Sequence, residues 1–166
     1  MQHPEQLNLF LAYDAVKAGR SALALLDHIA AKLKNRAVFN TKLWRFDLMT
    51  LAACAPQVEA DSSNADVVVV AFGTDGPVPL SLFQWLGGWA ARRHVKDAAL
   101  GALPTGAIAT QNALEAVETL QSLARHHGLR FIHREAKSKG GGLRGHIRRP
   151  QANAPGGDSI RQPERE

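Results

Sequence analysis

The sequence predicts a three-layer α/β sandwich whose five-stranded parallel sheet has the flavodoxin-like strand order 2-1-3-4-5. Three observations support this prediction. Apolar segments of strand length alternate with longer segments in which apolar residues recur at helical spacing. Residues 67–70 are four consecutive valines, which is typical of a parallel strand buried on both faces. Right-handed crossovers between parallel strands then leave few topologies.

The composition is that of a globular domain. The chain has 166 residues, of which 45% are hydrophobic and 21% charged, and this excludes a wholly disordered or fibrous protein. Its one cysteine, Cys54, cannot form an internal disulfide. No segment approaches the roughly 20 apolar residues of a membrane span, and the first residues lack the pattern of a signal peptide. We therefore expect a cytoplasmic protein that does not associate with membranes.

The first two expected strands flank a long helix. The apolar run at 7–13 is long enough for a buried strand. In the segment that follows, one helical stripe consists of Val16, Ala22, Leu25, Leu26, Ile29 and Leu33. A second strand is expected over 37–48, ending near Phe46. Its charged residues Lys42 and Arg45 favour a position at the edge of the sheet.

The middle of the chain contains the segment expected at the centre of the sheet. Pro56 suits the first turn of a short helix that extends to about Asn64. The central strand covers 65–72 and includes the valines. A loop over 73–79 and a helix over 80–93 follow.

The last two strands flank a helix that begins and ends at recognisable residues. A fourth strand is expected over 97–106, ending at a turn, and Thr110 is the expected cap of the next helix. The apolar stripe of that helix is Ala113, Leu114, Val117, Leu120, Leu123 and Ala124. Gly128 is a suitable helix stop, and the fifth strand is expected over 129–135.

Residues 137–166 are expected to form a disordered, basic, Gly/Pro-rich tail on a domain of residues 1–136. From residue 136 onward, seven basic side chains stand against three acidic ones, and Leu143, Ile147 and Ile160 are the sizeable apolar residues. Such a segment buries too little surface to offset its ordering entropy. It could make weak, non-specific contact with nucleic acid. Its lack of aromatic residues instead favours a solvated tail without a specific partner.

In a sheet of this topology, ligands bind beyond the carboxyl ends of the strands, at the switch point between the first and third strands. This rule selects three loops, whose candidate cofactor-binding residues are Asp14, Arg20, Ser21, Gly73, Thr74, Asp75, Gly76, Thr105 and Gly106. The glycines allow a ligand to approach the backbone, and the first helix offers unpaired N–H groups to an anion. Two alternatives stay open: three ordinary loops, or Asp14 as the cap of the first helix. No catalytic residue and no metal-binding motif is identified.

Part of the chain resembles the NADPH-dependent FMN reductase family. The residues that match its pattern around the third strand and the following helix are Ala65, Asp66, Val78, Pro79 and Trp89. The resemblance covers 7–135 in layout and 65–106 in detail. It implies a divergent protein that binds FMN, or a reductase that uses NAD(P)H.

The candidate loops depart from that family's pattern. Asp14 stands where a flavin phosphate would be held, and its charge would repel the phosphate. The loop after the third strand is GTDG, and the loop after the fourth is reduced to LPTG. Trp85 and Trp89 are four residues apart, so we expect them in the core or at a dimer contact rather than against a flavin.

The second resemblance is to response-regulator receiver domains. Asp14 fits their acidic metal-binding position, and Thr105 fits their hydroxyl position. The phosphoacceptor Asp that should end the third strand is replaced by Phe72 and Gly73. Phosphotransfer requires the carboxylate and the metal together. The alternative prediction is therefore a non-catalytic, receiver-like interaction module that binds a protein partner or a second copy of itself.

Overall fold

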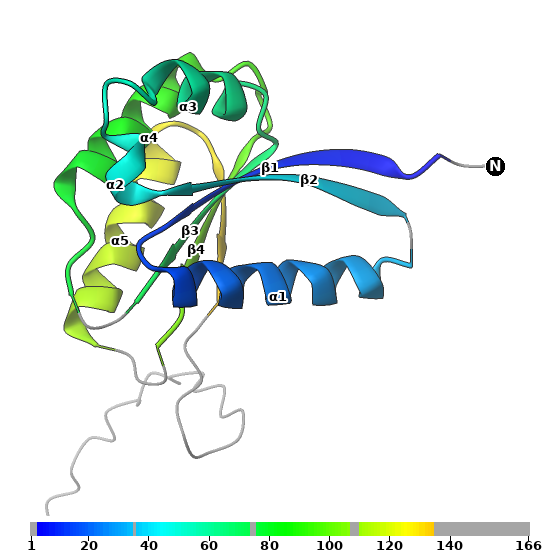
Figure 1. Cartoon of the computed structure of the whole chain (residues 1–166), viewed down its shortest axis with the longest axis horizontal. Helices are drawn as coiled ribbons and strands as arrows, with labels where there is room; N and C mark the ends of the chain where they lie inside the picture. The colour runs from blue at the N-terminus through cyan, green and yellow to red at the C-terminus, as the bar shows by residue number, and fades with distance from the viewer. Residues whose placement is uncertain (1–2, 35, 74–75, 107–109, 135–166) are drawn as a thin grey trace, which may run out of the picture.

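The structure is a computed structural model that describes residues 3–34, 36–73, 76–106 and 110–134. Its strands are β1 (Glu5–Tyr13), β2 (Ala37–Arg45), β3 (Val67–Phe72), β4 (Ala99–Pro104) and β5 (Arg130–His133). They form one sheet in the order β2-β1-β3-β4-β5, and every neighbouring pair is parallel (Figure 1). The predicted topology, with 65–72 central and the second strand at an edge, is confirmed.

Helices cover the two faces of the sheet unequally. The described helices are α1 (Val16–Lys32), α2 (Phe46–Met49), α3 (Ala55–Ser62), α4 (Leu80–Arg92) and α5 (Gln111–His126). In Figure 1, α1 lies on one side of the sheet, and the other helices lie on the opposite side. The fold is therefore a three-layer α/β sandwich of the flavodoxin-like class, with one described helix in one of its outer layers.

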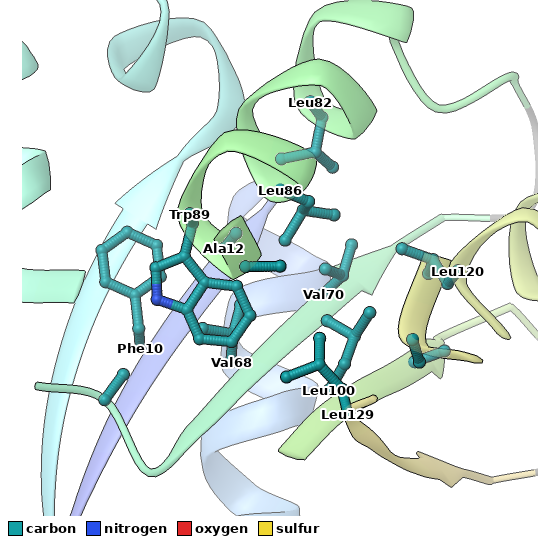
Figure 2. Packing of buried hydrophobic residues seen from close by; sticks show 14 of the residues in the cluster. Phe10, Ala12, Val68, Val70, Leu82, Leu86, Trp89, Leu100, Leu120 and Leu129 are labelled. Atoms are coloured by element: carbon teal, nitrogen blue, oxygen red, sulfur yellow. The ribbon is translucent and has the colours of Figure 1, made fainter. Parts of the chain in front are cut away.

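The larger hydrophobic core lies between the sheet and helices α3, α4 and α5. Phe10, Val68, Val70 and Leu100 point from the strands into this layer and are completely buried. They meet Leu86 and Trp89 of α4 and Leu120 of α5 (Figure 2). The two predicted end signals of α5 are confirmed, because the Thr110 hydroxyl accepts a bond from the Ala113 amide and Gly128 adopts φ +66° after the helix.

The smaller core lies under α1. Ala18, Gly19 and Ala22 are the buried residues of this helix, and their small size lets its first turns approach the sheet closely. A side chain at Gly19 would place its Cβ 3.1 Å from the ring of Tyr13. The strand residues in this cluster are Leu11, Ala71 and Leu103.

Several local expectations require correction. The valine strand is not fully buried on both faces, because Val67 and Val69, on the side of α1, are half-buried. Val16 and Leu114, expected in apolar stripes, are 53% and 52% exposed. The second strand ends at Arg45, which agrees with its expected end near Phe46. The residues that follow form α2, a helix that was not expected and that buries Phe46 and Met49.

The predicted tail, 137–166, lies outside the described residues, and so does the domain boundary at 136. No helix in the described ranges combines the length and apolar character needed to cross a membrane.

Candidate functional site

Asp14 joins the carboxyl ends of β1 and β3 at the switch point. Its Oδ2 atom accepts a hydrogen bond of 2.7 Å from the backbone amide of Gly73, and its own amide donates to the carbonyl of Ala71. The interpretation of Asp14 as the cap of α1 is wrong, because Ala15 is the N-cap residue and no side chain caps this helix. The Asp14 carboxylate instead occupies a backbone donor that a bound anion would need.

Thr105 joins β4 to the same edge. Its hydroxyl donates a hydrogen bond of 3.1 Å to the carbonyl of Phe72, and its amide donates to that oxygen at 2.9 Å. The half-buried Gly106 follows it. The polar groups of Asp14, Gly73 and Thr105 thus bond to the ends of neighbouring strands, which stabilises the edge of the sheet.

The other candidate residues do not join this group. Arg20 and Ser21 are exposed on α1 and form no hydrogen bond or ion pair with a described residue. Thr74 and Asp75 lie outside the described residues. Gly76 is exposed, and a Cβ at this position would meet no described atom within 4 Å. Across the described part of the chain, no three His, Cys, Asp or Glu side chains are grouped so as to hold a metal ion.

Asp66 joins β1 to β3 at the opposite edge of the sheet. Its Oδ2 atom accepts a hydrogen bond of 2.7 Å from the amide of Asn8, and its amide donates to the carbonyl of Asn8 at 2.8 Å. Asp14 and Asp66 therefore clamp the two ends of one strand pair. Asp66, part of the resemblance to FMN reductases, has a structural role here that is independent of any cofactor. Nothing in the sequence identifies Asn8 as its partner, 58 residues away.

Trp85 and Trp89 belong to the core, as expected. The ring of Trp85 stacks on that of Phe10, with centroids 5.1 Å apart. Trp89 is buried, and its indole N–H donates to the carbonyl of Ser62 at 2.9 Å. Both rings are thus held by protein groups.

An apolar groove of about 370 Å³ lies on the other face of the sheet, beside α1. Its floor includes Val67 and Val69 of β3, Gly101 and Leu103 of β4, and Ile132 of β5. Its wall is the sheet-facing stripe of α1, formed by Ala22, Leu25, Leu26 and Ile29. Ile132 and Ile29 are 51% and 38% exposed, so this face presents apolar surface to solvent.

The groove exists because the helices after β2, β3 and β4 all lie on the far face. On the near face, α1 contacts β1, β2 and β3, and no described helix lies over β4 and β5 (Figure 1). Gly101 adds no side chain to the floor, and a Cβ at this position would be in van der Waals contact with Cγ2 of Val69, at 3.4 Å. This groove was not predicted from the sequence. The available signal was the absence of an apolar helical stripe after the fifth strand.

Comparison with known proteins adds one distant structural similarity to report. No protein-family model and no curated protein matches the chain. Among solved structures, that of S. aureus homoserine dehydrogenase at pH 6.0 is similar over 79% of this chain and 33% of that one, with a TM-score of 0.49 and 12% identity. At this level of similarity, nothing about activity or ligands transfers between the two proteins.

Proposed function

We propose that this protein is a non-catalytic interaction module of flavodoxin-like topology that binds a partner in the groove beside α1. The observation that carries the proposal is the apolar floor across β3, β4 and β5. Contiguous exposed apolar surface of this kind commonly marks an interaction site. This agrees with the interaction-module interpretation of the sequence, and it moves the expected binding surface from the carboxyl edge to a face of the sheet.

The carboxyl edge supports the same proposal. The Asp14 carboxylate already accepts the Gly73 amide, and its charge opposes an incoming phosphate. The side chain that ends β3 is Phe72, which is buried and has no group to accept a phosphoryl transfer. These features weigh against the FMN-reductase and phosphotransfer interpretations of the candidate loops.

The first test of the proposed function uses a neutral hydrophobic fluorescent dye, Nile red, with the full chain. We expect saturable binding by the wild-type protein and at least a several-fold loss in Ile132→Asp, because a carboxylate on the groove floor opposes apolar ligands. Leu114→Asp is the matched control, since Leu114 is 52% exposed on α5, away from the groove. Circular dichroism verifies that each variant is folded. No saturable binding, or equal loss in both variants, would contradict the proposal.

A second test concerns the candidate FMN site. We expect neither the wild-type protein nor Asp14→Asn to bind FMN when flavin fluorescence and titration calorimetry are used. The resemblance to FMN reductases predicts a different result. Removing the charge should then tighten FMN binding by about ten-fold or more, equivalent to roughly 1.4 kcal/mol. That outcome would replace the interaction-module proposal with a divergent flavin protein.

A further inference from the structure

We propose that the groove receives an amphipathic α-helix of a partner protein, and that the polar face of this helix is acidic. The inference rests on the proposed function and identifies the kind of partner that the groove would take. It follows from the shape of the groove, from the charges around it, and from the poor fit of the two occupants that this chain itself could supply.

The shape of the groove suits a helix. It lies beside α1, and its lining extends from Phe39 of β2 to Ile132 of β5. Over β4 and β5, a doubly wound sheet ordinarily carries a second helix in the same layer. The wall of the groove follows i, i+3, i+4, i+7 spacing along α1, which is the spacing by which helices contact apolar neighbours. The floor is aliphatic, and Gly101 adds no side chain to it. Binding of a helix by an apolar groove is a recurrent mode of recognition.

The charges around the groove are mostly positive. On the β5 side, Arg130 is exposed, and Arg134 lines the groove itself. Along α1, the exposed basic residues are Lys17, Arg20 and Lys32. The acidic residues nearby are Asp14 just before α1, Asp27 on α1 and Glu5 at the start of β1. None of the five basic side chains forms an ion pair with a described acidic residue.

A helix lying beside α1 would bring its outward, polar face next to the outward face of α1. Acidic side chains on that face would meet unpaired basic groups on both sides of the groove, whereas basic side chains would be repelled. Such complementarity chiefly sets the association rate and the choice of partner. The apolar floor and wall provide the contact area.

A second copy of the chain fits the groove poorly. Because α1 projects from this face, two copies could bring their grooves together only with the outer face of each α1 against the floor of the other. That outer face carries Lys17, Arg20, Asp27, His28 and Lys32. Burying these groups on an aliphatic floor would leave charges without partners, which is costly.

The segment that follows β5 is also a poor occupant by its composition. Residues 137–166 offer three sizeable apolar side chains, Leu143, Ile147 and Ile160. The segment contains seven basic residues against three acidic ones, so its net charge has the same sign as the surroundings of the groove. Glycines and prolines disfavour a helix over most of its length.

The test uses two labelled synthetic peptides of about 15 residues, a length at which an isolated helix becomes marginally stable. Both carry leucines at i, i+3, i+4 and i+7. The polar positions are glutamate in one peptide and lysine in the other. Fluorescence anisotropy with the full chain should show binding of the acidic peptide, with the basic peptide at least about ten-fold weaker, and added salt should reduce the difference.

Variants separate the contribution of the floor from that of the charge. Ile132→Asn, which adds a polar group without a charge, should weaken the acidic peptide by at least about ten-fold, and the control Leu114→Asn should leave its affinity unchanged. Arg134→Glu should reduce the preference for the acidic peptide while leaving the binding of the neutral dye in place. If neither the Ile132 variant nor Arg134→Glu changes the binding of the acidic peptide, the inference is wrong.

The remaining outcomes distinguish this inference from the proposed function. Saturable binding of Nile red without binding of the acidic peptide would overturn the helical partner and leave the interaction-module proposal in place. Equal affinity for the two peptides, or a preference for the basic one, would overturn its acidic character. A Leu143→Ser/Ile147→Ser variant with increased peptide binding would assign the groove to the chain's own tail. A wild-type dimer that Ile132→Asp converts to a monomer would assign the groove to a second copy.

Discussion

Replacing Phe10 with alanine is expected to lower the free energy of unfolding by about 3–5 kcal/mol. Phe10 is completely buried in the larger core, and its ring stacks on Trp85 of α4. The substitution removes the burial of the ring and leaves a cavity at the contact between β1 and α4. Urea unfolding followed by tryptophan fluorescence measures the loss, and the change in native-state emission reports the loss of the stack.

Phe39→Ala is the matched control for this prediction. Phe39 is half-buried on the groove side of β2, so the same chemical change removes less buried surface. We expect a clearly smaller loss of stability than for Phe10→Ala. A loss below about 1 kcal/mol for Phe10→Ala would contradict the assignment of Trp85 to the core. It would also restore Trp85 as a candidate contact for a ligand near the candidate loops.

Asp66→Ala is expected to lower the free energy of unfolding by about 1.5–3 kcal/mol, the range for losing a hydrogen bond to a charged group. The substitution leaves the amide of Asn8 without the acceptor that it has at 2.7 Å. Asp14→Ala removes the equivalent bond to Gly73 at the other end of the strand pair, and we expect a smaller loss there because Asp14 is exposed to solvent.

Two comparisons make this prediction specific. Asp66→Asn retains a side-chain oxygen that can accept the same amide, so it should retain more stability than Asp66→Ala. The Asp14→Ala/Asp66→Ala variant should lose close to the sum of the single losses, since the two bonds lie at opposite ends of the strands and share no partner. If Asp66→Ala unfolds at the same urea concentration as wild type, Asp66 does not clamp the strands, and its match to the FMN-reductase pattern regains functional interest.

The topology could be predicted because a buried strand is a continuous run of apolar residues, which can be recognised in the sequence. The run Val67–Val70 and the apolar segment before Asp14 identified two central strands, and helical spacing identified the long crossovers. The end of β2 near Phe46 was also predicted, but the short helix α2 that follows was not. An aromatic residue next to Asp47 and Leu48 suits a strand or a helix, and tertiary burial of Phe46 decides between them.

The candidate site was harder to predict because its bonds join residues far apart in the chain. The position of Asp14 at the switch point followed from the topology, but its partner Gly73 is 59 residues away and offers only a backbone amide. The groove is harder still. Ile132 and Leu25 look like ordinary core residues in the sequence, and only the arrangement of the helices leaves the surface between them open.

The groove beside α1 also affects how easily strand β5 separates from the sheet. Strand β5 has four residues, and among the described strands it pairs with β4 alone. Helix α5 covers it on one side. Strand β5 therefore has little buried apolar area to lose when it separates from the sheet. Its backbone amides are expected to exchange with solvent through partial openings that leave the other strands paired. A ligand bound in the groove would contact β5 and make these partial openings less frequent. Slower exchange of the β5 amides would therefore be the earliest sign that the groove is occupied.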